Sequence, residues 1–242
     1  MILSAVFLSR LFLLALVSGA PATAWQESSD TYYVVFLRRD PARKPLSEAE
    51  GKRIQSAHME NILNMGERGV LVAAGPFDDD PPAISGIFVM RASSVEEAQR
   101  IAAEDPTVVE HRNAIDVHAW HGPKGIGDEY RRLHKEQPEA PGNMGIHPLC
   151  MLFTGPAWDT NPNDRARLLK AHQAYFDKLR STGKLGAAGE VDGDKELVGI
   201  AIFKRLQSEE AQKLMEEDPA VKAGLFRVEH HRWWSVDHVL PW

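Results

Sequence analysis

The spacing of apolar residues changes several times along the chain and predicts alternating strands and helices. An apolar, β-rich run at 31–37 is typical of a strand covered on both faces, whereas apolar residues three or four apart over 47–67 predict an amphipathic helix. Ser93 and Glu96 have the spacing of a capping box that opens a second helix. The elements predicted for this part are strand 31–37, helix 47–67, strand 70–74, strand 84–91, helix 93–103 and strand 114–120.

The same pattern occurs a second time in the chain. A shift of 114 residues superposes 69–80 on 183–194, and after one deletion a shift of 113 superposes Trp120 on Trp233. An ordered series of matches with a single gap indicates a tandem duplication of one small domain. The elements predicted for the second copy are strand 149–154, helix 162–182, strand 185–189, strand 197–204, helix 208–216 and strand 228–234.

The βαββαβ order of each copy predicts a ferredoxin-like domain, in which both helices cover one face of an antiparallel sheet. We therefore expect an α+β protein with domains at 31–120 and 147–234, joined by a linker at 121–146 that is rich in Gly, Pro and charge. The two uncovered sheet faces would pack together as an intramolecular dimeric α+β barrel. Such a chain would be a monomeric pseudo-dimer or a weak homo-oligomer.

Composition and the first residues limit the partners and the location. The net charge of −6, without a Lys/Arg cluster, argues against a nucleic-acid surface. Residues 1–24 have the features of a signal peptide, because Arg10 precedes the apolar run 11–17 and Ala22-Thr23-Ala24 has the form of a cleavage site. An uncleaved anchor is the alternative, although an Arg inside a membrane span is costly. We expect a periplasmic or secreted protein without membrane contact after cleavage; its single cysteine, Cys150, excludes an intrachain disulfide.

Each copy carries a histidine within the apolar stripe of its first helix. His58 and His172 occupy the same position, and each is followed 20 residues later by an aspartate, Asp78 or Asp192. A carboxylate that holds one ring nitrogen of a histidine fixes its tautomer and favours general-base chemistry. The four residues are therefore candidate catalytic residues.

Two alternatives to this interpretation stay open. A buried histidine can instead be satisfied by a backbone carbonyl, and aspartate is favoured in loops for turn formation alone. Asp80 and Asp194 also match between the copies, so the sequence does not decide which aspartate would be the partner.

The last strand of each copy offers a second group of polar side chains. Alternation places one set of three on a single face of each strand: Asp116, His118 and Trp120, and in the second copy Glu229, His231 and Trp233. These faces would line a polar cavity between the sheets or form an exposed strand edge. No metal site is expected, because the adjacent His230 and His231 point to opposite faces and no cysteine accompanies them. The chain also lacks phosphate-loop and nucleophile-elbow motifs.

The repeated residues carry a resemblance to a known family. The sequence is similar to the YciI-like domain family over 31–120 and 147–234, on the following motif: His58, Gly69, Leu71, Ala73-Ala74-Gly75-Pro76, Asp78, Gly86, Glu96-Glu97-Ala98, Asp105-Pro106 and Trp120. The resemblance implies the dimeric α+β barrel fold. It also implies a His–Asp acid–base pair, His58 with Asp78 and His172 with Asp192. One similar member is a dehydrochlorinase of a chlorinated hydroxyhydroquinone, which implies proton abstraction from a small polar ring compound.

Two functions are compatible with these features. The first is an exported lyase or isomerase without a cofactor, in which His58 removes a proton and Asp78 orients it. The candidate substrate-binding residues are Ser56, Gly75, Pro76, His118, Trp120 and His231. The second is a non-catalytic module that binds a small molecule or a protein. The second copy departs from the motif at Glu190, which replaces Pro76, and at Lys170, which replaces Ser56. Any chemistry is therefore expected in the first copy.

Overall fold

The computed structural model describes residues 29–79, 83–138, 142–193, 196–204 and 206–241. The predicted signal peptide at 1–24 lies outside the described residues, as do Asp80 and Asp194. Within the described part of the chain, no helix is both long enough and apolar enough to cross a membrane.

Both copies show the predicted βαββαβ order, and each adds a short helix that begins at an Asp-Pro pair. Repeat 1 consists of β1 (Ser29–Arg39), α1 (Glu48–Glu67), β2 (Leu71–Pro76), β3 (Ile84–Met90), α2 (Val95–Ala102), α3 (Pro106–Val109) and β4 (Asn113–Pro123). Repeat 2 consists of β5 (Met144–Thr154), α5 (Pro162–Ser181), β6 (Leu185–Val191), β7 (Leu197–Phe203), α6 (Ser208–Glu217), α7 (Pro219–Lys222) and β8 (Phe226–Val236). The predicted linker contains the end of β4, helix α4 (Asp128–Glu136) and the start of β5.

Local capping explains where the helices of repeat 1 begin. Ser47 and Glu50 form a capping box at the start of α1. The box predicted for the next helix is displaced by one residue: Ser94 caps α2 and accepts a hydrogen bond from the backbone of Glu97. The neighbouring Ser93 also binds the Glu97 carboxylate, which is why the two serines are difficult to distinguish in the sequence.

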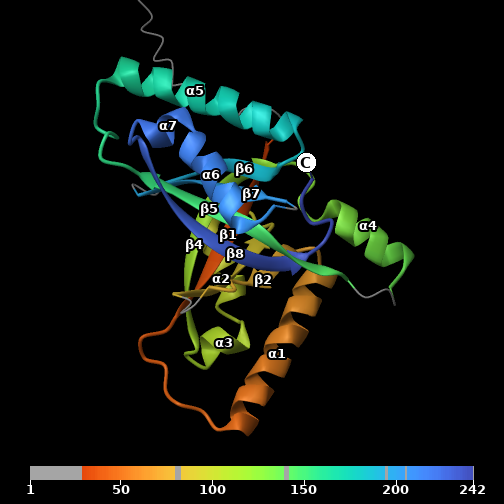
Figure 1. Cartoon of the computed structure of the whole chain (residues 1–242). Coiled ribbons are helices and arrows are strands. Elements are labelled where there is room, and N and C mark those ends of the chain that lie inside the picture. The colour runs from red at the N-terminus through yellow and green to blue at the C-terminus, as the bar shows by residue number, and fades with distance from the viewer. Residues whose placement is uncertain (1–28, 80–82, 139–141, 194–195, 205, 242) are drawn as a thin grey trace, which may run out of the picture.

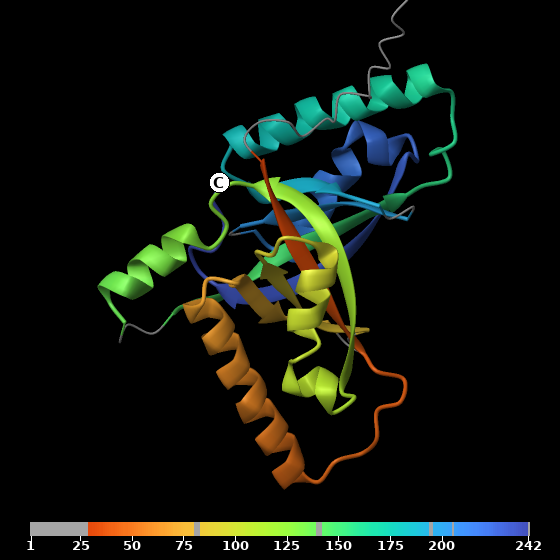
Figure 2. The ribbon, with the colours of Figure 1, turned by 180° about the vertical axis from the view of Figure 1, so that it is seen from behind.

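The eight strands form one antiparallel sheet in the order β2-β3-β1-β4-β6-β7-β5-β8. Strands β4 and β6 join the repeats through the pairs Trp120–Val191 and His121–Glu190. The outer strands β2 and β8 meet at the bridge Phe77–Trp233, so the sheet curls into a nearly closed barrel. Helices α1–α3 and α5–α7 cover its outside on opposite sides (Figures 1 and 2). This arrangement confirms the predicted intramolecular α+β barrel.

Glycine is required where the two repeats meet. A Cβ atom on Gly75 of β2 would lie 1.9 Å from the carbonyl oxygen of Trp234, and one on Gly189 of β6 would lie 1.9 Å from that of His121. The two seams, β2/β8 and β4/β6, are thus equivalent down to this contact. The duplicated Ala-Ala-Gly sequence therefore serves the close approach of the strands.

Apolar side chains fill the barrel and close one of its ends. Trp120 and Trp233 are fully buried in the interior cluster, which Ile126 and the C-terminal residues Val239 and Leu240 join. The Gly127 N–H donates to the Val239 carbonyl over 2.8 Å, and this hydrogen bond joins the segment after β4 to the segment after β8. This plug lies where β4 and β8 end, and the opposite end carries the polar residues of both strands.

Candidate functional site

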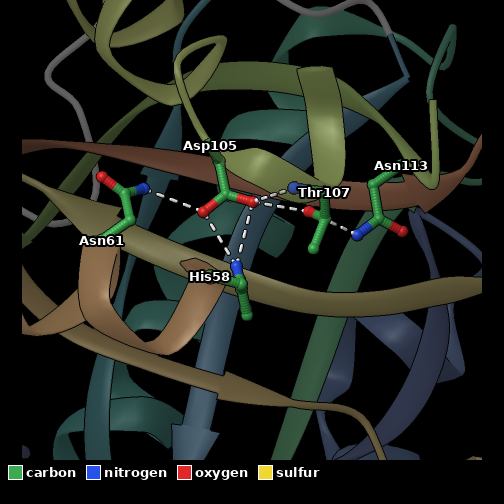
Figure 3. A network of polar contacts seen from close by, with 5 residues as sticks. All are labelled: His58, Asn61, Asp105, Thr107 and Asn113. Carbon is green, nitrogen blue, oxygen red and sulfur yellow. Dashed lines mark hydrogen bonds and ion pairs between the residues drawn. The ribbon is translucent and has the colours of Figure 1, made fainter. Parts of the chain in front are cut away.

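His58 is bound to a buried carboxylate, but the carboxylate is Asp105. The Nδ1 atom of His58 on α1 lies 2.9 and 2.8 Å from the two Asp105 oxygens. Asn61, one turn further along α1, donates to Asp105 over 2.9 Å, and the backbone and hydroxyl of Thr107 donate over 2.9 and 2.6 Å. Asn113 on β4 donates in turn to the Thr107 hydroxyl (Figure 3). The network fixes the Asp105 carboxylate from three elements, α1, α3 and β4.

The geometry of this network leaves one ring nitrogen of His58 for chemistry. Because an ionised carboxylate only accepts hydrogen bonds, Nδ1 carries a proton, and in the neutral ring the lone pair is therefore on Nε2. Nε2 makes no hydrogen bond to a described residue and is not closed off from solvent. The His58 side chain is 13% exposed, and its ring stacks on Phe88 of β3.

The Asp105 carboxylate is held in its ionised form. Burial favours the neutral acid, but the hydrogen bonds from His58, Thr107 and Asn61 outweigh burial and lower the pKa of Asp105. The same carboxylate caps α3 by accepting from the Thr107 N–H. Asp105 therefore stays charged beside an accessible histidine.

Repeat 2 keeps the His–Asp pair but loses its polar surroundings. His172 binds Asp218, and both side chains are almost completely buried, at 1% and 0% exposure. The repeat shifts place apolar or larger side chains where repeat 1 has the rest of its network, namely Tyr175 for Asn61, Ala220 for Thr107 and Phe226 for Asn113. The Phe226 and Phe176 rings pack against His172, with centroids 5.1 and 4.2 Å away.

The predicted pairs of His58 with Asp78 and of His172 with Asp192 are not present. Asp78 follows β2 at the β2/β8 seam, where its N–H donates to the Arg232 carbonyl and its carboxylate lies 3.2 Å from the Arg232 side chain. Asp192 occupies the equivalent place at the β4/β6 seam and lies 2.6 Å from Nε2 of His121. Both aspartates are used at the seams, because β2 and β6 end against the last strand of the other repeat.

The last strands alternate as predicted and point their histidines into the barrel. His118 packs edge-on against Phe36, and its Nε2 lies 2.9 Å from Asp116. His231 stacks on Phe77, and its Nδ1 lies 2.7 Å from Asp79 of the other repeat. The two histidines lie at the end of the barrel that the apolar plug does not close.

The other candidate binding residues are dispersed. Ser56 is exposed on α1 outside the Asp105 network, and Pro76 is exposed at the end of β2. Gly75 is explained by the seam contact, and Trp120 is buried in the barrel interior. An open pocket of about 620 Å³ brings together His118 of β4 and Asp192, which were candidates in different copies.

The sequence contained one signal for the true partner of His58. Asp105-Pro106 recurs as Asp218-Pro219, a pattern typical of both a turn and a helix start. The contributions of Asn61, Thr107 and Asn113 had no such signal, because these residues do not recur in the second copy.

A comparison with protein families agrees with the duplication and the fold. The model of the YCII-related domain matches twice, at residues 31–119 and 150–234. The chain belongs to the YCII-related domain family. No curated protein matches this YCII-related chain. Among solved structures it is similar to a heme-binding protein from Thermus thermophilus, at 15% identity and a TM-score of 0.51, covering 86% of this chain and 94% of the other. It is also similar to a chlorite dismutase variant from Candidatus Nitrospira defluvii, at 11% identity and a TM-score of 0.55, covering 88% and 93%. At these identities the likeness shows the fold alone.

Proposed function

We propose that this YCII-related protein is an acid–base enzyme, a lyase or isomerase of small polar organic molecules, with His58 as the base. The observation that carries the proposal is the accessible Nε2 of His58, backed by a fully buried and anchored Asp105. This is the arrangement of a general base whose tautomer is fixed and whose protonated form is stabilised. No cofactor is part of the proposal.

The proposed chemistry uses two steps of proton transfer. Nε2 takes a proton from a substrate carbon next to an electron-withdrawing group, and the imidazolium that forms is stabilised by Asp105. Return of that proton to another carbon gives an isomer. Alternatively, the electron pair left on the carbon forms a double bond to the neighbouring carbon, whose leaving group departs with its own bonding pair; this is elimination, after which Nε2 releases its proton to water. The Asp105 partners Asn61 and Thr107 act as positioning residues.

Proton abstraction can be measured before the substrate is known. The full chain, incubated in D₂O with a panel of small keto acids and hydroxyketones, should incorporate deuterium into at least one compound, as followed by ¹H NMR. His58→Gln should lower that rate about 100-fold or more, which is the usual contribution of a general base. Glu60→Gln, an exposed change on the same helix, should have no effect. Equal rates for wild type and His58→Gln would contradict the proposal.

A structural role for the pair is the second candidate, and repeat 2 provides the observation for it. His172–Asp218 is kept there in a buried, aromatic setting that no substrate reaches. In both repeats the His–Asp hydrogen bond would then only hold the first helix against the third, which is compatible with a non-catalytic binding module. In that case His58→Gln would lower stability without changing any exchange rate.

Heme, which one similar structure binds, does not fit the enclosed histidine of repeat 2. The His172 ring is held between Asp218, Phe176 and Phe226, so a macrocycle would have to displace the aromatic rings. The proposed proton transfers do not involve heme.

We further propose that the chain is exported to the periplasm or secreted. The support is the apolar run 11–17 with the Ala22-Thr23-Ala24 site. Amino-terminal sequencing of protein from the native host should then begin at Trp25; an intact Met1 would contradict export with cleavage.

A further inference from the structure

The loop between β1 and α1 gathers basic side chains that the His58 network does not use. Arg39 ends β1, and Arg43 and Lys44 follow in the loop; all three are exposed. Arg112, which lies 68 positions after Lys44, donates a hydrogen bond from its guanidinium group to the Lys44 carbonyl. The loop passes beside α3 (Figures 1 and 2). The fold therefore adds a fourth cation to three that are already close in the sequence.

The conformation of this loop is fixed by the protein itself. The Asp40 N–H donates to the Arg112 carbonyl over 3.2 Å, and the Arg43 N–H donates to the Asp40 carbonyl over 3.0 Å. The Asp40 carboxylate accepts from the Ala42 N–H over 2.7 Å, which is the hydrogen bond of an Asx-turn. Arg112 is thus held through both its backbone and its side chain. A ligand of the loop would find these groups already ordered.

The positive charge of the loop is not neutralised within the described part of the chain. None of the four basic side chains forms an ion pair with a described residue. The carboxylates next to them in the chain are engaged elsewhere: Asp40 lies 3.3 Å from His111, and Glu110 lies 2.8 Å from Arg53 of α1. Even with Asp40 counted, the loop and Arg112 carry an excess of positive charge.

The basic side chains are close enough to repel one another. The pKa of Arg43 is lowered, first by partial burial and then by the charges of Arg112 and Arg39. Lost hydration and like charge both disfavour a cation. An anion bound between these groups would replace the lost hydration and remove the repulsion.

Repeat 2 shows that the fold does not need basic residues at this place. Its loop 155–161 contains no Lys or Arg, and Leu225, which is fully buried, stands where repeat 1 has Arg112. The backbone contact is nevertheless the same, since the Gly155 N–H donates to the Leu225 carbonyl over 2.8 Å. The four cations of repeat 1 are therefore not explained by the turn that they occupy.

We propose that this basic loop binds a phosphate group, with Arg43 and Arg112 contacting its oxygens and Arg39 and Lys44 adding positive charge. Guanidinium groups match the spacing of phosphate oxygens, and a doubly charged anion suits this excess of positive charge better than a single carboxylate. The group belongs to free phosphate or to a small phosphate monoester. The site is separate from the proposed base, because His58 lies about 16 Å along α1 from the end of the loop at Ser47.

Titration with anions of different charge tests the ligand class. Phosphate and acetate are each added to the ¹⁵N-labelled full chain at pH 7.5 and constant ionic strength, so that screening does not change. Phosphate should shift the backbone amides of Ala42, Lys44 and Arg112 in a saturable manner, with a Kd on the order of 1 mM for so small a ligand. Acetate should bind at least tenfold more weakly. Equal affinity for both anions, no shifts with phosphate, or shifts confined to other residues would each overturn the proposal.

A third titration, with glycerol 3-phosphate, distinguishes the two sources of the phosphate group. A lower Kd than that of phosphate would support a small phosphate monoester as the ligand. A higher Kd would support free phosphate.

Charge-removing variants test the residues of the site. Arg112→Leu introduces the residue of repeat 2 and should weaken phosphate binding at least tenfold. Arg43→Gln changes an exposed side chain and should weaken it about fivefold, so the test survives if Arg112→Leu disturbs the loop. Arg68→Gln removes the same charge from an exposed position at the other end of α1 and should leave the Kd within about twofold. Wild-type affinity in Arg43→Gln or in folded Arg112→Leu, or an equal loss in Arg68→Gln, would overturn the proposal.

Discussion

At the scale of single residues, one histidine–aspartate pair is present in two environments. In repeat 1 the pair belongs to a polar network, and the His58 ring reaches solvent. In repeat 2 the pair is enclosed by phenylalanine rings. A buried carboxylate that keeps hydrogen-bond donors stays ionised, and its contribution to folding then depends on pH.

Replacing Asp105 by Asn should lower stability in a pH-dependent way. The pKa of Asp105 is lowered in the folded protein, so the stabilisation is fully present above its unfolded value, near 4, and is lost as the pH falls through the folded value. We expect a loss of about 2–4 kcal/mol in the free energy of unfolding at pH 7, since one partner of a buried pair is removed. Urea unfolding at pH 7 and pH 3 should show the difference from wild type shrinking at the lower pH. A difference that is equal at both pH values would contradict this assignment.

At the scale of strands and helices, the seams depend on glycine and the helices do not. Gly75 and Gly189 each face a carbonyl oxygen of the neighbouring repeat at a distance no Cβ tolerates. At Gly51, within α1, a Cβ atom would meet no neighbouring atom within 4 Å. The same substitution should therefore have opposite effects at the two kinds of site.

Gly75→Ala should destabilise the protein by about 2 kcal/mol or more, because the strands β2 and β8 must separate to admit the methyl group. Gly51→Ala should stabilise it by about 0.5–1 kcal/mol through helix propensity. Chemical denaturation of both variants measures the two changes. A neutral Gly75→Ala would show that the seam is loose.

The sequence predicted the elements well and the site poorly, for a physical reason. Strands and helices follow from local periodicity, and the duplication provides two independent sequences for the same set of elements. The partner of His58 depends on how α3 folds back on α1, which joins residues 47 positions apart. Asp192 was assigned to His172 of its own repeat, whereas the seam places it beside His121. Contacts between repeats have no signature in the pattern of either repeat alone.

At the scale of the whole molecule, the two repeats share one interior. The cluster inside the barrel contains Val34 and Trp120 of repeat 1 together with Leu149 and Trp233 of repeat 2. Neither repeat can keep the inner face of its four strands buried without the other. The two repeats should therefore unfold together as one cooperative unit.

Leu149→Ala tests this coupling, because Leu149 is fully buried in the shared interior. We expect it to lower the free energy of unfolding by about 2–5 kcal/mol. Native-state hydrogen exchange should then show amides of β1 and β5 becoming faster to the same extent. Faster exchange confined to repeat 2 would show that the repeats unfold independently.

The unequal seams have a consequence for how such a fold can evolve. In a homodimer of identical chains, a substitution at one interface also occurs at the symmetry-related interface. Its cost in stability is therefore counted twice. A covalent duplication removes that constraint. Here one interface carries Arg232 and Asp79, whereas the equivalent positions of the other carry Ala119 and Gly193, so the two interfaces differ in their side chains. In a duplicated chain each interface can therefore change its side chains while the other keeps its own contacts.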